Sequence, residues 1–221
     1  MDESCYICLE QYSLEDAFDI VPMCVDHRAE YQAIQTEKEL RSVLPNGFHG
    51  AKPKDLSKSL AEWDCAAGLY LYGPVGTGKS HAAAAMVKRW YVHQIRLGNR
   101  PVVVWMNMPA TILATLTEFS KGAVGKPGVL WDAATNAGLL VIDDIGVEQP
   151  KEWVKTRLYG LVEYRMHQAL TTIVTSNLTL AKLEHRLDSP QIASRLSQHC
   201  AQVSFEGKPD RRPGLAPELR G

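Results

Sequence analysis

Residues 73–80 read GPVGTGKS and fit the pattern G-x-x-x-x-G-K-[ST], whose four defined positions hold Gly73, Gly78, Lys79 and Ser80. Glycines adopt backbone angles that other residues avoid, so successive N–H groups can turn inward around an anion. The lysine then reaches the β- and γ-phosphates of a nucleotide, and the serine hydroxyl ligates Mg²⁺. The segment predicts a site for ATP and Mg²⁺. We expect the nucleotide to contact Gly73, Pro74, Val75, Gly76, Thr77, Gly78, Lys79, Ser80 and His81.

Two adjacent carboxylates, Asp143 and Asp144, follow the apolar run Leu139–Ile142. The carboxyl ends of parallel strands are where α/β sheets bind ligands. We expect Asp143 to hold Mg²⁺ together with Ser80, and Asp144 to polarise the attacking water as a general base. An Asp-Asp pair alone would equally suit a turn or a helix cap, so the hypothesis depends on its combination with GPVGTGKS.

A third polar group is needed to orient that water beside the γ-phosphate, and the segment TIVTSN, residues 172–177, supplies one. Asn177 fills this role if its strand lies between the two strands that carry the loop and the acidic pair. The alternative is that Asn177 is a simple turn residue.

Strand-like and helix-like segments alternate along the chain and would position these groups. Short apolar or β-branched runs predict strands at 68–72, 101–106, 139–142, 171–175 and 201–205. Helical patterns occupy 81–97, 110–119, 152–170 and 189–199. This alternation predicts an α/β fold: a five-stranded parallel sheet with helices on both faces.

The composition, with 45% hydrophobic and 22% charged residues among 221, is typical of a globular protein. No apolar stretch has membrane length, and the start MDESCYICLE lacks the features of a signal peptide, so we expect a cytoplasmic protein with no membrane partner. Residues 1–40 carry a net charge of −8 and the remainder +7. The basic residues 41–221 would attract nucleic acid, although an ordinary solvated surface explains the same charges.

The N-terminal region contains a possible metal site in the spacing C-x2-C-x15-C-x2-H, formed by Cys5, Cys8, Cys24 and His27. Two close pairs of such ligands can converge on one tetrahedral Zn²⁺. A structural metal would also offset the small core of a region this short. The alternative is a set of buried or stray cysteines.

Six segments together resemble the DnaC-like bacterial replicative helicase loaders, which are AAA+ ATPases related to the IstB-like ATPases. They are LPNGFHGA, GLYLYGPVGTGKSHAAAAM, LLVIDDIG, RLYGLVEYRM, TIVTSNL and QIASRLSQ, and they lie within residues 44–205. The resemblance implies a P-loop AAA+ domain that hydrolyses ATP weakly as a lone subunit. It also implies self-association into a ring or spiral, and delivery of a replicative DNA helicase to single-stranded DNA.

The resemblance also assigns roles to single residues. Asn177 becomes the sensor of the γ-phosphate, and Arg195 the arginine finger offered to ATP on a neighbouring subunit, unless Arg195 is an ordinary surface residue. The loaders commonly carry another arginine four positions before the finger, where this chain has Gln191. Arg186 is a candidate substitute for it.

In the resembling family, the segment SKGAVGKPG, residues 120–128, holds an insertion that faces the central channel of the assembly. Lys121 and Lys126 are therefore candidates for contact with single-stranded DNA through phosphate attraction. A flexible solvated loop is the alternative.

The chain ends sixteen residues after Phe205 in EGKPDRRPGLAPELRG, which is too short and too rich in Pro and Gly for a C-terminal helical lid. We expect an N-terminal zinc-binding and partner-binding region, a linker and lead-in, an AAA+ ATPase domain and a flexible tail, at residues 1–40, 41–67, 68–206 and 207–221. Two alternatives to a helicase loader remain. One is an IstB-like transposition helper ATPase, and the other is a zinc-headed adaptor that uses nucleotide as a switch with little hydrolysis.

Overall fold

The computed structural model describes residues 3–4, 11–12, 25–65, 67–120, 128–147 and 150–211. The chain divides into two compact units, residues 1–46 and 47–221. In the first unit, the short strands β1 (Glu3–Ser4) and β2 (Gln11–Tyr12) pair in antiparallel fashion. The same unit contains the 19-residue helix α1 (Val25–Val43), which continues through residue 40 without a break.

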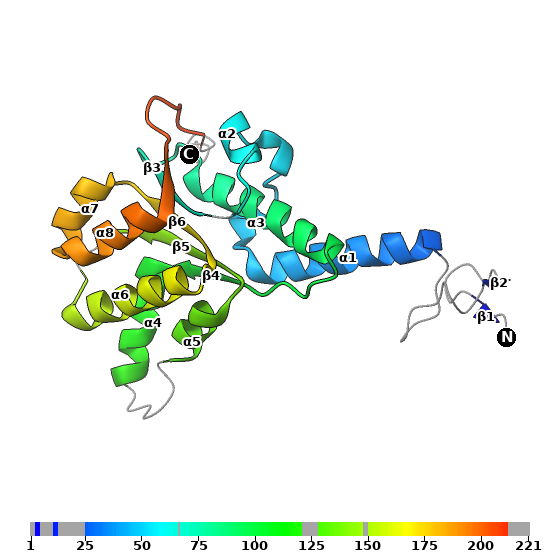
Figure 1. Cartoon of the computed structure of the whole chain (residues 1–221), viewed down its shortest axis with the longest axis horizontal. Coiled ribbons are helices and arrows are strands. Elements are labelled where there is room, and N and C mark those ends of the chain that lie inside the picture. Colours follow the sequence, from blue (N-terminus) through cyan, green and yellow to red (C-terminus); the bar gives the residue numbers. More distant parts are fainter. Residues whose placement is uncertain are drawn as a thin grey trace, which may run out of the picture. The chain divides into compact units, whose positions relative to one another are not determined.

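The second unit is built on a five-stranded sheet in which all neighbouring strands are parallel (Figure 1). Its strands, in the spatial order β4-β5-β6-β3-β7, are β4 (Val103–Asn107), β5 (Leu139–Ile145), β6 (Thr171–Ser176), β3 (Gly68–Tyr72) and β7 (Cys200–Ser204). The predicted α/β fold with five parallel strands is therefore confirmed. Strand β6 lies between β3 and β5, which is the position that the role suggested for Asn177 requires.

Helices connect and cover the strands. They are α2 (Lys58–Ala61), α3 (Lys79–Arg96), α4 (Met108–Ser120), α5 (Val129–Asn136), α6 (Glu152–His167), α7 (Leu180–Leu187) and α8 (Pro190–His199), with 3-10 turns η2 (Asn46–Phe48) and η3 (Pro53–Asp55) before them. Helices α2, α5 and α7 of this unit were not predicted, and neither was α1 of the first unit. Helix α6 ends at His167 rather than at Leu170, because Ala169 adopts a left-handed backbone conformation with φ 50°.

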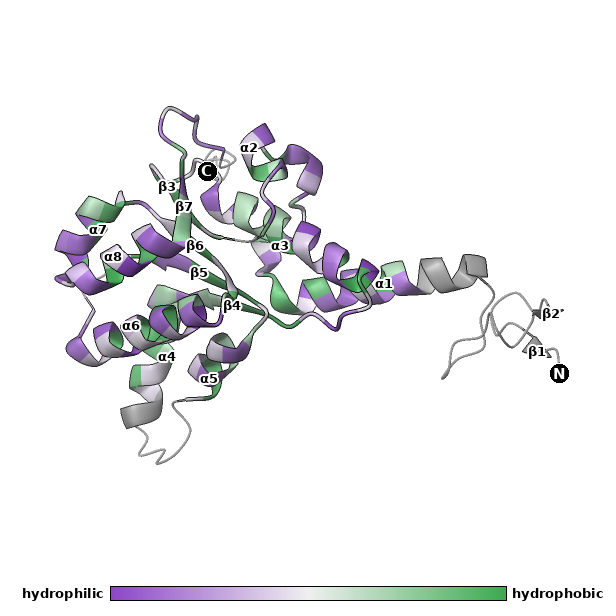
Figure 2. Ribbon diagram, in the orientation of Figure 1, coloured by the Kyte–Doolittle hydropathy of each residue, from purple (hydrophilic) through white to green (hydrophobic). Residues whose placement is uncertain are grey.

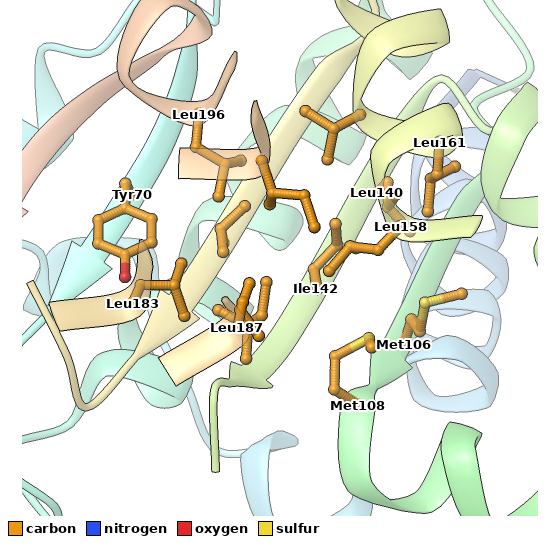
Figure 3. Packing of buried hydrophobic residues seen from close by; sticks show 14 of the residues in the cluster. Tyr70, Met106, Met108, Leu140, Ile142, Leu158, Leu161, Leu183, Leu187 and Leu196 are labelled. Atoms are coloured by element: carbon orange, nitrogen blue, oxygen red, sulfur yellow. The ribbon is translucent and has the colours of Figure 1, made fainter. Parts of the chain in front are cut away.

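The sheet is apolar on both faces, as expected for parallel strands covered by helices. Leu139, Leu140, Val141 and Ile142 of β5 are all fully buried. Figure 2 shows hydrophobic residues concentrated along β4 and β5, while the covering helices mix hydrophobic and hydrophilic residues. Successive strand residues point to opposite faces. On one face, a single cluster (Figure 3) joins the sheet to α6, α7 and α8 through Tyr70, Leu140, Ile142, Leu158, Leu161, Leu183, Leu187 and Leu196.

One cation, Arg165 of α6, is completely buried in this region. Its guanidinium donates to the carbonyls of Ala134 at 2.8 Å, Ala137 at 2.7 Å and Thr171 at 2.6 Å. It also donates to the Thr172 hydroxyl at 3.0 Å. The end of α5 and the start of β6 are thus fixed to α6 by carbonyl and hydroxyl oxygens. Burial lowers the pKa of Arg165 to about 10, so it remains charged at neutral pH.

Residues 205–211 follow β7 and contain no helix, so no helical lid begins in the part of the tail that the structure describes. None of the helices in the described ranges combines the length and the hydrophobicity that crossing a membrane requires.

Candidate active site

The glycine-rich loop joins the end of β3 to the start of α3 at the carboxyl edge of the sheet (Figure 1). Gly73, Gly76 and Gly78 have φ angles of 143°, 80° and 92°, which residues other than glycine rarely adopt. Within the loop, the hydroxyl of Thr77 donates to the carbonyl of Pro74 at 2.8 Å. The glycines therefore produce the tight turn that an anion-binding loop needs, directly before a helix N-terminus.

Lys79 is the first residue of α3, and its ammonium group lies within the loop with only 5% of the residue exposed. Its Nζ donates to the carbonyls of Gly73 at 2.9 Å and Pro74 at 2.8 Å, and to Oδ1 of Asn177 at 2.8 Å. Burial lowers the pKa of Lys79, while the charges of Asp144 and Asp143 oppose that shift. The lysine thus places its ammonium group inside the loop, next to the end of β6.

Ser80 and Asp143 are in direct contact. The Ser80 hydroxyl donates to Oδ1 of Asp143 at 2.7 Å, and the Thr175 hydroxyl donates to the same oxygen at 2.7 Å. The Asp143 residue is only 3% exposed. Hydroxyl and carboxylate oxygens are the hard ligands that Mg²⁺ prefers. The chemistry of the pair therefore fits Mg²⁺, which Ser80 and Asp143 would hold.

Asp144 stands beside this pair in an unusual backbone conformation, with φ 59°. The pairing of β5 with β6 shifts register between Ile142 and Ile145, so the acidic pair lies on an irregular strand end. Such irregularities re-aim side chains. Strain of about 1–3 kcal/mol for a left-handed residue other than glycine is typical of functional sites, although Asp tolerates this region better than most residues.

The carboxyl group of Asp144 is partly buried and lies close enough to Asp143 and Lys79 to interact with their charges. Burial raises the pKa of Asp144, the nearby charge of Asp143 raises it further, and Lys79 opposes both effects. A general base works best when its pKa lies close to the working pH. The geometry and the direction of the pKa shift both suit a group that accepts a proton from water.

Thr175 was not predicted from the sequence, and it connects the two carboxylate residues. Besides donating to Asp143, its hydroxyl oxygen accepts a hydrogen bond of 3.0 Å from the backbone N–H of Asp144. Thr175 is fully buried on β6. A single hydroxyl therefore sets the positions of both acidic residues.

These groups surround a cavity of about 730 Å³. Of the predicted nucleotide contacts, its lining includes Val75, Gly76, Gly78, Lys79, Ser80 and His81. Asp144 and Asn177 also line it, and Asp143 lies beneath through its bond to Ser80. Gly47, Phe48, Val147 and Arg211 complete the wall, and none of them was among the predicted contacts. A cavity of this volume matches the usual range for small-molecule and cofactor sites.

Arg195 does not line this cavity. It lies on α8, where its Nε is 2.5 Å from Oε2 of Glu163 and its Nη1 donates to Gln198 at 3.0 Å. The predicted substitute arginine, Arg186, donates to the carbonyls of Gly146 at 3.3 Å and Val147 at 2.8 Å. Arg195 is thus separated from the cavity of its own subunit, as a residue acting on a neighbour would be.

Several predicted residues fall outside the described parts of the chain. These are the zinc ligands Cys5, Cys8 and Cys24, the side chain of His27, and the DNA-contact candidates Lys121 and Lys126. Within the ranges that the structure does describe, no group of three or more His, Cys, Asp or Glu side chains could hold a metal. The zinc and DNA assignments stay predictions.

The glycine-rich loop follows β3, and the acidic pair lies at the end of β5, which β6 separates from β3. This arrangement defines a P-loop protein of the AAA+ type. The sequence model of the family described as IstB-like ATP binding protein matches residues 25–213. The chain therefore belongs to this family of ATP-binding proteins.

The chain is also similar to proteins of replication initiation. It is 25% identical over 171 residues to the replicative helicase loader DnaI of Bacillus subtilis (strain 168), a match covering 72% of this chain and 52% of that protein. The chain thus spans about half the length of this curated relative. The crystal structure of the DnaC helicase loader has a TM-score of 0.59 at 21% identity, covering 72% of this chain and 99% of that one.

A third similar structure is that of AMPPCP-bound DnaA from Aquifex aeolicus. It has a TM-score of 0.56 at 18% identity and covers 74% of this chain and 51% of that one. At these identities the two solved structures show a shared fold. Together with the family match, they confirm the resemblance inferred from the sequence motifs.

Proposed function

We propose that the protein is an ATPase that loads a replicative DNA helicase onto single-stranded DNA. The observation that carries the ATPase is the convergence of three elements on one cavity. Lys79 of α3 bonds Asn177 after β6, and Ser80 bonds Asp143 of β5. The names of the relatives DnaI and DnaC support the loading role.

In the proposed reaction the loop amides and Lys79 bind the phosphates, while Ser80 and Asp143 hold Mg²⁺. Bound Mg²⁺ neutralises charge on the phosphate oxygens. Asp144 accepts the proton of the attacking water, and Asn177 orients that water beside the γ-phosphate. Arg195 of a neighbouring subunit stabilises the charge of the transition state, because a planar guanidinium can bond two phosphate oxygens at once.

Assembly is part of the proposal. ATP binding orders subunits into a ring or spiral, which places each Arg195 against the next cavity. Residues 68–206 form the ATPase domain, and residues 1–40 form a zinc-binding region that grips the helicase. The excess of acidic residues in that region would suit a basic patch on the partner. Lys121 and Lys126 contact single-stranded DNA.

A transposition helper ATPase is the second candidate, and the match to the IstB-like family favours it. Purification of the tagged chain from cell extract with ATP present separates the two functions. Recovery of a hexameric helicase supports the loader, whereas recovery of a transposase with double-stranded DNA contradicts it. A chain that captures neither partner and turns over ATP equally with and without single-stranded DNA would match the zinc-headed adaptor instead.

The zinc prediction has its own measurement. One Zn²⁺ per purified chain is expected, and Cys5→Ser combined with Cys8→Ser should remove it. A double variant that retains full metal content would contradict the assignment.

A further inference from the structure

The segment that follows β7 runs along the glycine-rich loop and is bonded to it near both ends. The backbone N–H of Phe205 donates to the carbonyl of Tyr72 at 2.7 Å, just before the loop. The backbone N–H of Arg211 donates to the carbonyl of Gly76 at 2.8 Å, within the loop. Residues 206–211 are therefore held against the loop by main-chain hydrogen bonds that do not depend on their side chains.

The approach is close enough to require the glycines of the loop. A Cβ at Gly76 would overlap the carboxylate of Asp210. A Cβ at Gly73 would lie 2.9 Å from the carbonyl carbon of Phe205, and one at Gly78 would lie 3.2 Å from Cδ of Arg211. The same three glycines that permit the tight turn thus also admit the C-terminal segment.

Arg211 lies where two cavities meet. It lines the 730 Å³ cavity together with Gly78, Lys79 and Ser80. It also lines an adjoining cavity of about 290 Å³, whose walls include Leu56, Leu60, Phe205 and Lys208. Gly78 and His81 belong to both linings, so the two cavities are neighbours at the start of α3.

A second cation of the segment is close to Arg211. The ammonium group of Lys208 lies 3.7 Å from the centroid of the Phe205 ring. Burial lowers the pKa of Lys208, and the charge of Arg211 lowers it further. Positive charges that repel one another beside an anion-binding loop would be stabilised by an anion between them.

We propose that residues 206–211 hold Arg211 in the wall of the nucleotide site, and that the guanidinium of Arg211 contacts the phosphates of nucleotide bound to the same subunit. The inference rests on the proposed ATP site. Arg211 is suited to the contact because its guanidinium donates in a planar fork that matches phosphate oxygens. Its backbone is already fixed to Gly76, so binding orders only the end of the side chain.

The test compares the affinities of Mg·ATP and Mg·ADP for the full chain and its variants by isothermal titration calorimetry. Arg211→Ala keeps the backbone bond to Gly76 and should weaken both nucleotides about tenfold, as loss of a charged hydrogen bond does. Arg211→Lys should retain part of the affinity, and Arg211→Glu should lose more than the alanine variant. Arg96→Ala, an exposed change at the far end of α3, is the matched control and should bind as the parent does.

Each result decides between clear alternatives. Unchanged affinity in Arg211→Ala, with the parent chain binding normally, overturns the role of Arg211 and leaves the ATP site intact. Tighter binding in that variant would show that the segment blocks the site rather than completing it, which also overturns the inference. Failure of the parent chain to bind nucleotide would overturn both proposals together. Melting curves without nucleotide confirm that the variants are folded.

Discussion

The ammonium nitrogen of Lys79 and the amide oxygen of Asn177 lie 2.8 Å apart, although 98 positions separate the two residues in the chain. The contact exists because β6 is inserted between β3 and β5. It brings the group that binds phosphate next to the group proposed to orient water.

Substitution of Lys79 should therefore affect ATP binding, whereas substitution of Asn177 should affect turnover. Lys79→Ala should abolish ATP binding, because it removes the ammonium group proposed to reach the β- and γ-phosphates from within the loop. Asn177→Ala should leave ATP affinity largely unchanged and reduce turnover about 10²-fold, the usual effect of removing one positioned polar group. Calorimetry and steady-state phosphate release measure the two quantities. Full ATP affinity in Lys79→Ala would count against the site.

Variants of Thr175 test whether its hydroxyl affects turnover by positioning Asp143 and Asp144. Thr175→Val keeps the shape of the side chain but removes the hydroxyl that bonds Asp143 and the N–H of Asp144. We expect turnover to fall and the free energy of unfolding to drop by about 1–3 kcal/mol, because two buried polar groups lose a partner. Thr175→Ser keeps the hydroxyl and should recover most of both losses. Equal damage in the serine and valine variants would assign the effect to packing alone.

Asp144 should give the reaction an acidic limit. Its pKa is raised, mainly by burial and then by Asp143, so turnover should fall as the pH drops through this raised value and the base becomes protonated. Asp144→Asn should lose turnover at every pH while still binding ATP, since asparagine also tolerates a left-handed backbone. A pH–rate profile of the parent chain that stays flat down to the ordinary range of carboxyl groups would contradict the assignment.

The same group predicts a pH-dependent stability of definite sign. A raised folded-state pKa means that the folded protein binds this proton more tightly than the unfolded chain does. The carboxylate therefore lowers stability above its unfolded pKa, and this penalty disappears as the pH falls below that value. Asp144→Asn should melt at a higher temperature than the parent chain at neutral pH, and the difference should shrink in acid.

The sequence predicted the parts of this architecture that depend on local pattern. Leu139–Ile142 is apolar throughout, so its burial in a central strand followed from composition, and GPVGTGKS specified a loop between a strand and a helix. The sequence of helix α7 also contains signals that indicate a helix. Thr179 accepts a hydrogen bond from the N–H of Lys182, and buried leucines recur along the helix at positions 180, 183 and 187.

The contacts of Thr175 and Arg211 could not be predicted, because they join segments that are distant in the sequence and no local pattern shows which segments become neighbours. Thr175 looks like any β-branched strand residue until β6 lies beside β5 and its hydroxyl meets Asp143. Arg211 stands in a segment rich in Pro and Gly that predicts only a flexible tail, yet its backbone bonds Gly76. The roles of the individual site residues stay predictions until variants are measured.

Substitution of the buried Arg165 should destabilise the fold without removing any residue of the nucleotide site. Arg165→Met removes the donor shared by Ala134, Ala137 and Thr171, and leaves buried carbonyls without a partner. Each unsatisfied group costs about 1–3 kcal/mol, so the melting temperature should fall clearly. Arg165→Lys keeps the positive charge but not the planar arrangement of donors. Its melting temperature should therefore lie between those of the parent chain and Arg165→Met. A methionine variant as stable as the parent chain would show that the hydrogen bonds contribute no net stability.

Arg195 allows the proposed assembly to be tested by mixing inactive subunits. Its guanidinium is paired with Glu163 on its own subunit and does not line its own cavity. Arg195→Ala should therefore bind ATP normally but lose about 10³-fold in turnover, as expected for a finger supplied by a neighbour. Lys79→Ala lacks a working cavity but still presents Arg195. Mixed assemblies of the two variants should regain measurable turnover, since some intact cavities then face an intact arginine. Lack of recovery in assemblies shown to contain both subunits would mean that Arg195 acts within its own chain, through α8 and Glu163.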